Sequence, residues 1–272
     1  MTRGSPRRLG SLVATVAVVA LAGTGALAVD VAPAAAAPKP ATLRILVTND
    51  DGVGAPGIDA LVQGLRRLDR VRVTVVAPAA NQSGTGDRTT PGALTTEQAT
   101  TTSGYPAVAV QGFPADTVNF ALDGGIAEKP HLVASGVNAG QNLGPVVNIS
   151  GTVGAARTAV RRAVPGVAIS QGLAESPDYA SGVREAVRWV KEHRKALTKK
   201  GAKPPTEVAN INVPTCPTGK VRGIVDVPSA TAGDITVTPD CLSKLKKPAD
   251  DVIAFANGYA SLSEVPPGVP SG

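Results

Sequence analysis

The fold is decided by a ten-residue stretch, LRILVTNDDG at residues 43–52. Its first six residues are β-branched or otherwise largely apolar, which is typical of a buried parallel strand, and the last four indicate a turn. Pro56 then opens an amphipathic helix whose apolar face includes Leu61 and Leu65. A second apolar strand at 71–77 closes the unit. This strand–helix–strand pattern predicts an α/β fold.

The alternation continues to about residue 213, after a Gly-, Ser- and Thr-rich loop expected at 78–104. Strands are expected at 108–110, 132–135, 167–170 and 208–213, and helices at 114–122, 152–164 and 178–197. Such alternation predicts a mostly parallel sheet that is covered on both faces. The segments after residue 214 are short and punctuated by Pro and Gly, and they predict a short C-terminal β-hairpin extension.

The first 36 residues are typical of an export signal, with arginines before an almost unbroken apolar stretch and then a run of small residues for cleavage. An uncleaved anchor helix is the alternative, because the apolar stretch is just long enough to span a bilayer. We expect a secreted protein, free of the membrane after cleavage, with residues 37–272 as one domain. The only cysteines, Cys216 and Cys241, are predicted to form a disulfide, since such a pair is usually oxidised after export.

The composition excludes several classes of function. Aromatic residues make up only 3% of the chain, which disfavours a protein that stacks single-stranded nucleic acid. Two histidines and two cysteines nearly exclude a zinc site. His131 is expected at the amino end of a strand and His193 in a basic helix, so neither suits a Ser-His-Asp hydrolase. The cations at 191–203 fit a solvated helix end better than a surface for duplex nucleic acid.

The strongest chemical feature is the adjacent pair Asp50 and Asp51 at the end of the first strand. Two such carboxylates repel each other and lose hydration unless a cation compensates, so a hard divalent metal ion is one natural partner. The alternative is that one aspartate caps the next helix and the other is solvated. Ser83 and Asn138 follow other strands and are expected at the same edge of the sheet, although each alone is a weak signal.

Residues 150–152, Ser-Gly-Thr, precede a predicted helix. Hydroxyls and free backbone N–H groups at a helix N-terminus can bind an anion such as phosphate. An ordinary N-cap is the alternative, and from these residues alone it is favoured.

Four motifs together resemble the SurE-type survival-protein nucleotidases, in the same order and at similar spacing. They are ILVTNDDG at 45–52, NQSG at 81–84, SGVNAGQNLG at 135–144 and SGTVGAA at 150–156. The resemblance implies a Rossmann-like, doubly wound α/β fold and a metal-dependent phosphomonoesterase acting on nucleoside 5′- and 3′-monophosphates. Two other functions stay open: a broad extracellular phosphatase or exopolyphosphatase, and a catalytically silent phosphate- or nucleotide-binding protein.

The resemblance also implies the roles of single residues. One divalent ion, Mg²⁺ or Mn²⁺, is expected to be held by Asp50, Asp51, Ser83 and Asn138, with both aspartates catalytic. The expected phosphate or substrate contacts come from Asn49, Asn142, Ser150, Gly151 and Thr152.

The sequence also departs from the family pattern. Ile149, Thr158 and Phe113 stand where the family usually has Tyr, Glu and Thr. The segment at 221–250 is shorter than the hairpin that builds the family's oligomers, so a homodimer is an expectation that this departure leaves open.

Overall fold

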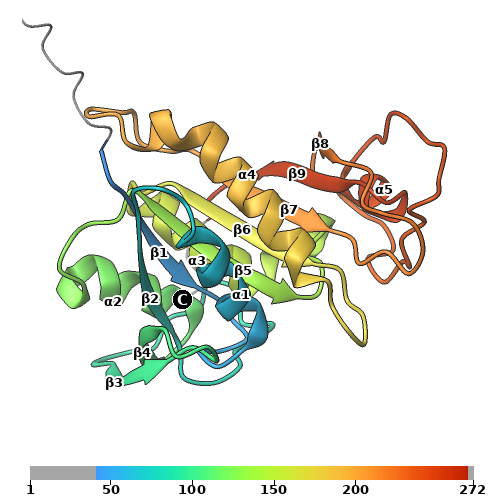
Figure 1. Ribbon diagram of the computed structural model, residues 1–272. Coiled ribbons are helices and arrows are strands. Elements are labelled where there is room, and N and C mark those ends of the chain that lie inside the picture. Colours follow the sequence, from blue (N-terminus) through green and yellow to red (C-terminus); the bar gives the residue numbers. More distant parts are fainter. Residues whose placement is uncertain (1–40, 269–272) are drawn as a thin grey trace, which may run out of the picture. The chain divides into compact units, whose positions relative to one another are not determined.

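The structure is a computed structural model in which residues 41–268 are described (Figure 1). The predicted export signal at 1–36 lies outside these residues. Within them, all strands join one sheet in the order β3-β4-β2-β1-β5-β6-β7-β9-β8. Their bounds are β1 (Leu43–Thr48), β2 (Val71–Pro78), β3 (Thr95–Thr100), β4 (Pro106–Gln111), β5 (Leu132–Ala139), β6 (Gly166–Gln171), β7 (Val208–Val213), β8 (Ile224–Asp226) and β9 (Ala260–Val265).

The centre of the sheet is parallel, from β4 through β2, β1, β5 and β6 to β7. β1 and β7 have the bounds predicted from the sequence, because their side chains are buried almost throughout. The predicted α/β fold with a mostly parallel sheet is therefore confirmed.

Both ends of the sheet differ from the predictions. β3 lies in the segment 78–104, which was predicted to be a loop, and pairs antiparallel with β4. Its sequence, TTEQAT, is polar and mostly exposed, so it lacks the apolar alternation that marks a strand.

The predicted C-terminal hairpin is also wrong. β9 pairs antiparallel with β7, and β8 pairs parallel with β9. The chain between β8 and β9 contains a helix and long loops, so these two neighbours along the chain run in the same direction rather than turning back on each other.

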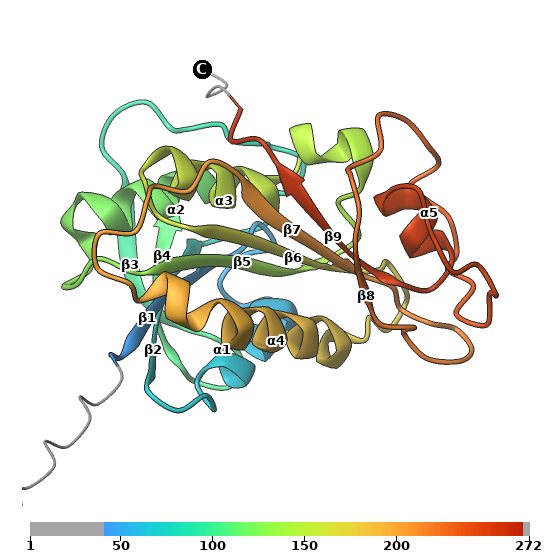
Figure 2. The same cartoon turned by 90° about the horizontal axis from the view of Figure 1, so that it is seen from above.

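Helices cover both faces of the sheet, with α1 and α4 on one face and α2 and α3 on the other (Figure 2). No helix in the described range is long and apolar enough to cross a membrane. The bounds are α1 (Pro56–Leu65), α2 (Pro114–Phe120), α3 (Gly151–Arg161), α4 (Tyr179–Leu197) and α5 (Asp251–Ala256), with a π-helical turn η1 (Ala121–Gly125) and a 3₁₀ helix η2 (Gly144–Asn148).

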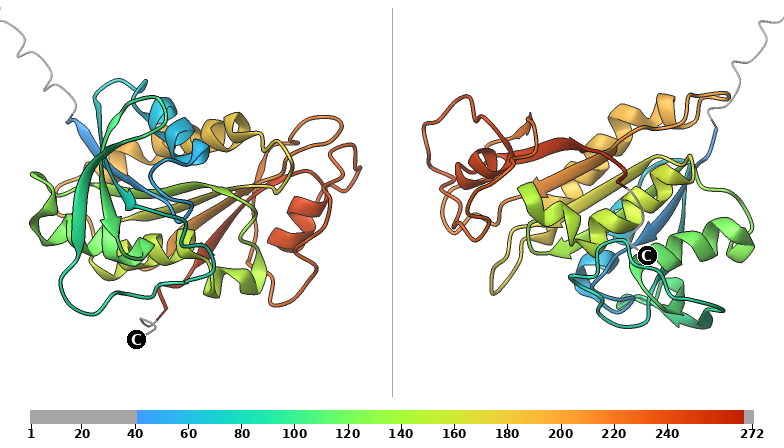
Figure 3. Two further views of the ribbon diagram at one scale, coloured as in Figure 1. Left: turned by 90° about the horizontal axis from the view of Figure 1, so that it is seen from below. Right: turned by 180° about the vertical axis from the view of Figure 1, so that it is seen from behind.

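β1 is buried on both faces, which explains where the site must form. Ile45 and Val47 belong to the apolar cluster under α1 and α4, whereas Leu46 packs with residues of α2 and α3. Because both faces are covered, the polar residues that follow β1 can reach solvent only at the carboxyl edge of the sheet. The helix α5 lies at this same end, next to η2 (Figure 3).

Candidate active site

Asp50 and Asp51 lie directly after β1, in a turn that local hydrogen bonds hold in place. The side-chain amide of Asn49 donates to the carbonyl of Gly52 over 2.9 Å. The backbone N–H of Gln82, next to Ser83, donates to the carbonyl of Asp50 over 2.7 Å. The structure thus brings the segment with Ser83 against the backbone of Asp50, at the edge of the sheet where both were expected. Asn49 itself is fully buried, and its expected contact with substrate stays a prediction.

Asp50 faces the N-terminus of α3. The hydroxyl of Thr152 donates to Oδ1 of Asp50 over 2.6 Å. A Cβ atom at Gly151 would lie 2.7 Å from the Cβ of Asp50, so only glycine lets the helix approach this closely. Burial raises the pKa of Asp50, while hydrogen bonds from Thr152 and from the backbone at Gly151 and Thr152 oppose that rise. The start of α3 therefore stabilises a negative charge at this position.

Asp51 is half-buried and accepts a hydrogen bond of 3.2 Å from the backbone N–H of Ala139, at the end of β5. Burial raises the pKa of Asp51 to about 6, and the neighbouring charge of Asp50 adds to the rise. The two carboxylates thus lie largely out of water and repel each other. A bound cation would remove both penalties.

The residues around the pair fit a hard divalent cation. Among the residues that the structure describes, no three His, Cys, Asp or Glu side chains cluster, so neutral oxygens would have to complete the site. The side-chain amide of Asn138 donates to the carbonyl of Gly140 over 2.6 Å, which leaves its side-chain oxygen able to act as a ligand. Ser83 is exposed and directly follows Gln82, whose backbone N–H bonds to the carbonyl of Asp50. Two carboxylates, an amide oxygen and a hydroxyl form the oxygen-rich set that Mg²⁺ or Mn²⁺ prefers.

Besides Asn49 and Thr152, two more of the expected phosphate contacts have partners within the protein. The hydroxyl oxygen of Ser150 accepts from the backbone N–H of Val153 over 3.1 Å, so Ser150 is the N-cap of α3. Asn142 is buried, and its side-chain amide donates to the hydroxyl of Ser170 over 2.9 Å. The carbonyl of Asn142 also accepts from the side chain of Asn212 on β7. Phosphate contacts by Ser150 and Asn142 stay predictions.

The model of the family described as "Survival protein SurE" matches residues 45–233. The chain belongs to the SurE family.

Relatives of this SurE-family chain include "5'-nucleotidase SurE" of Desulfatibacillum aliphaticivorans, 38% identical over 67% of this chain and 70% of that protein. "5'-nucleotidase SurE" of Alkalilimnicola ehrlichii is 32% identical over 82% of this chain and 89% of that protein. The crystal structure of the SurE protein from Aquifex aeolicus superposes with a TM-score of 0.66 at 28% identity, covering 83% of this chain and 94% of that one.

Tyr179 is a neighbour of the site that was not predicted from this SurE-family sequence. Burial raises the pKa of its phenol, and the negative charge of Asp51 adds to the rise, so the two side chains lie within electrostatic reach. Tyr179 opens α4, which follows the carboxyl end of β6. The rule that placed Asp50 and Asn138 at this edge applies equally to the start of α4 and was the signal that could have found it.

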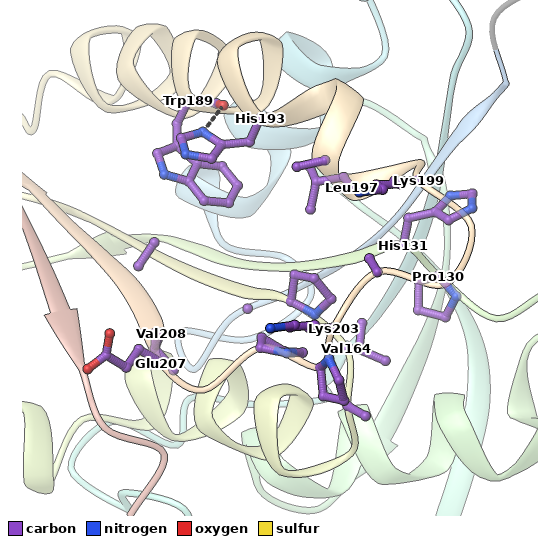
Figure 4. Close-up of a pocket in the computed structure, with 18 of the residues that line it drawn as sticks. Pro130, His131, Val164, Trp189, His193, Leu197, Lys199, Lys203, Glu207 and Val208 are labelled. Carbon is purple, nitrogen blue, oxygen red and sulfur yellow. Dashed lines mark hydrogen bonds between the residues drawn. The ribbon is translucent and has the colours of Figure 1, made fainter.

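The histidines of this SurE-family chain lie away from the site, as expected. Both line a cavity of about 800 Å³ that the amino ends of β5, β6 and β7 border (Figure 4). His193 stacks on Trp189 with ring centres 4.1 Å apart and bonds to that residue's carbonyl. His131 accepts a hydrogen bond from the backbone N–H of Arg44 through Nδ1. These contacts give both histidines structural roles.

The segment between β7 and β9 is held by two features, a disulfide within it and a contact with η2. Cys216 and Cys241 form a disulfide with their Cα atoms 5.8 Å apart, the pairing predicted from the sequence. The fully buried carboxylate of Asp251 on α5 accepts from the backbone N–H groups of Gly144, over 3.0 Å, and of Ala230, over 2.8 Å. The second contact set links α5 to η2, which leads into the start of α3.

Proposed function

We propose that the protein hydrolyses nucleoside 5′- and 3′-monophosphates to nucleoside and phosphate, with one divalent ion, Mg²⁺ or Mn²⁺. The observation that carries this proposal is the carboxylate of Asp50 held between the end of β1 and the N-terminus of α3 by the hydroxyl of Thr152. The relatives named 5'-nucleotidase SurE support it.

The chain's own residues prepare this edge of the sheet for a phosphoryl group. A divalent ion there would supply polarisation of the phosphoryl group and a more acidic water. Asp50 is held in one orientation by Thr152, so it can carry a ligand bond without rearranging. The amides at the start of α3 donate to the carboxylate of Asp50 and so favour its charged form at this edge.

The other functions kept open in the sequence have less support. A broad phosphatase would need only the aspartate pair and the start of α3. A silent binding protein would not need two adjacent carboxylates at its phosphate site. We also propose that the protein is secreted, which the export-signal pattern at 1–36 and the disulfide between Cys216 and Cys241 support. The homodimer stays a prediction that light scattering of the purified protein would test.

A release assay tests the proposed function. Phosphate release would be measured from nucleoside monophosphates, polyphosphate and an aryl phosphate, with Mg²⁺, with Mn²⁺ and with a chelator. We expect nucleotides to turn over well above the aryl ester and chelator to stop the reaction. Equal turnover of both esters would favour the broad phosphatase, and binding without turnover the silent binding protein.

A further inference from the structure

A second cavity opens beside the aspartate pair, on the side of β6 and β7. Its volume is about 370 Å³, in the range of small-molecule sites. Three of its walls follow the carboxyl ends of strands, at 139–141 after β5, at 173–174 after β6 and at 215–217 after β7. The C-terminal segment 235–239 and Phe255 of α5 close it.

This cavity shares a wall with the aspartate pair. Ala139 lines the cavity, and its backbone N–H donates to Oδ2 of Asp51. Gly140 also lines it, and the carbonyl of Gly140 accepts from Asn138. One substrate molecule can therefore have its phosphate at the aspartates and its organic part in the cavity.

The lining has the chemistry of a site for an uncharged flat group. No Asp, Glu, Lys, Arg or His lines the cavity, and apolar surface comes from Leu173, Ile235, Val237 and Phe255. Further phosphate groups of a polyphosphate would find no cation there, and burying them would cost their hydration. A neutral aromatic base would instead remove apolar surface from water.

Two polar side chains of the wall, Gln141 and Thr215, already make hydrogen bonds within the protein. The side chain of Gln141 accepts from the backbone N–H of Leu173 over 2.9 Å and donates to the carbonyl of Ile235. The hydroxyl of Thr215 donates to the carbonyl of Gly172 over 2.7 Å and accepts from the amide of Gln171 over 3.0 Å. The cavity therefore recognises shape and apolar surface more than a pattern of hydrogen bonds.

The closing wall is held firmly in place. The disulfide joins Cys216, between two lining residues, to Cys241, two residues beyond the lining residue Pro239. Phe255 packs with Leu143 and Val252, and partly buried Ile235 packs against them. Because this wall is preformed, little conformational entropy is lost when a ligand binds.

We propose that this cavity, which we call the base pocket, binds the base of a nucleoside monophosphate, and that it favours nucleotides over polyphosphate and over phosphate esters of small hydrophilic alcohols. The proposal rests on the proposed function, since it adds the organic half of the substrate to the same site. Its apolar lining also implies weak discrimination between one base and another.

Leu173→Ser tests the proposal, with Leu242→Ser as its matched control. Leu173 lines the base pocket and is 72% exposed, so its loss leaves the fold intact. Leu242 is similarly exposed, at 61%, and is not among the lining residues. Wild type and both variants, loaded with Mn²⁺, would be assayed on adenosine 5′-monophosphate and glycerol 2-phosphate, and adenosine binding measured by calorimetry.

We expect Leu173→Ser to lower the ratio of kcat/KM for the nucleotide over the glycerol ester roughly 10-fold, mainly through KM, and Leu242→Ser to leave the ratio unchanged. An equal ratio in both variants overturns the base pocket while the proposed function stands. If wild type hydrolyses no nucleotide, the proposed function fails. The base pocket is then tested separately by adenosine binding. Adenosine binding weakened by Leu173→Ser alone then supports the pocket, and binding that is absent or equal in all three proteins overturns it.

Discussion

The two halves of the candidate site are built from different parts of the chain and have different chemistry. The phosphate half, Asp50 and Asp51 with the start of α3, is charged, closely hydrogen-bonded and carried by the parallel core. The base pocket is uncharged and is closed by the segment between β7 and β9, which the disulfide braces. The contrast separates what drives the reaction from what selects the organic part of the substrate, and each half can be disturbed alone.

The largest effect is expected from Asp50→Asn, which breaks the phosphate half. Loss of this carboxylate should lower kcat/KM at saturating metal by about 100- to 1,000-fold for every phosphate ester, because cation and phosphoryl group lose their partner. The melting temperature of the metal-free protein should not fall, since a buried charge is removed. Asp69→Asn is the matched control, because that side chain is 92% exposed. Near-wild-type turnover in Asp50→Asn would contradict the assignment.

Thr152→Val tests one hydrogen bond of the phosphate half. The hydroxyl of Thr152 donates to Asp50, so its loss leaves a buried carboxylate without one donor. We expect kcat/KM to fall about 10- to 100-fold and stability by roughly 1.5–3 kcal/mol, measured by phosphate release and urea unfolding. Thr152→Ser keeps the hydroxyl and should restore both quantities. If Thr152→Ser were as poor as Thr152→Val, shape rather than the hydrogen bond would matter.

Metal affinity should depend on pH through the phosphate half alone. The pKa of Asp51 is raised to about 6 by burial and by the charge of Asp50, so a proton competes with the cation below that pH. Between pH 7 and pH 5 the affinity for Mn²⁺ should fall about 10-fold, as measured by calorimetric titration. The same shift makes the metal-free protein gain stability from Asp51 as the pH falls through about 6. An affinity for Mn²⁺ that stays constant over this range would contradict the role of Asp51.

The smallest effect on activity is expected from Cys216→Ser combined with Cys241→Ser, which loosens only the base pocket. KM for a nucleoside monophosphate should rise a few-fold, while kcat for glycerol 2-phosphate changes less, because the phosphate half keeps its own contacts. The free energy of unfolding should fall by about 3 kcal/mol, the value typical of a disulfide that closes a loop of this length. An equal loss on both substrates would mean that the two halves are not independent.

The elements predicted best from the sequence are those with a clear local pattern, either continuous burial in a strand or a capped amphipathic helix. β1 and β7 are buried on nearly every side chain, and α4 begins after Asp178 and ends at Leu197 as predicted. β3 was missed because its polar residues carry no burial pattern, and it forms because β4 offers an edge to pair with. The C-terminal hairpin was wrongly predicted. β8 and β9 run parallel, because the direction of a strand at the edge of a sheet depends on how the chain between the strands packs.

The candidate site shows the same division. The aspartate pair could be predicted because its chemistry is local: two carboxylates after a buried strand. The role of Ser150 as the N-cap of α3 was likewise the one that the local sequence favoured. The contact of Thr152 with Asp50 could not be predicted, because it depends on which way the side chain turns once α3 is docked.

The sequence by itself determined the parallel core, the turn that carries Asp50 and Asp51, and the edge of the sheet at which both lie. These follow from hydrophobic pattern and turn preference, which act over a few residues. Only the tertiary structure decided that the hydroxyl of Thr152 orients Asp50 and that α5 closes an uncharged pocket beside them. The physical reason is that such contacts join residues about a hundred positions apart, and their geometry arises only when the helices and strands pack together.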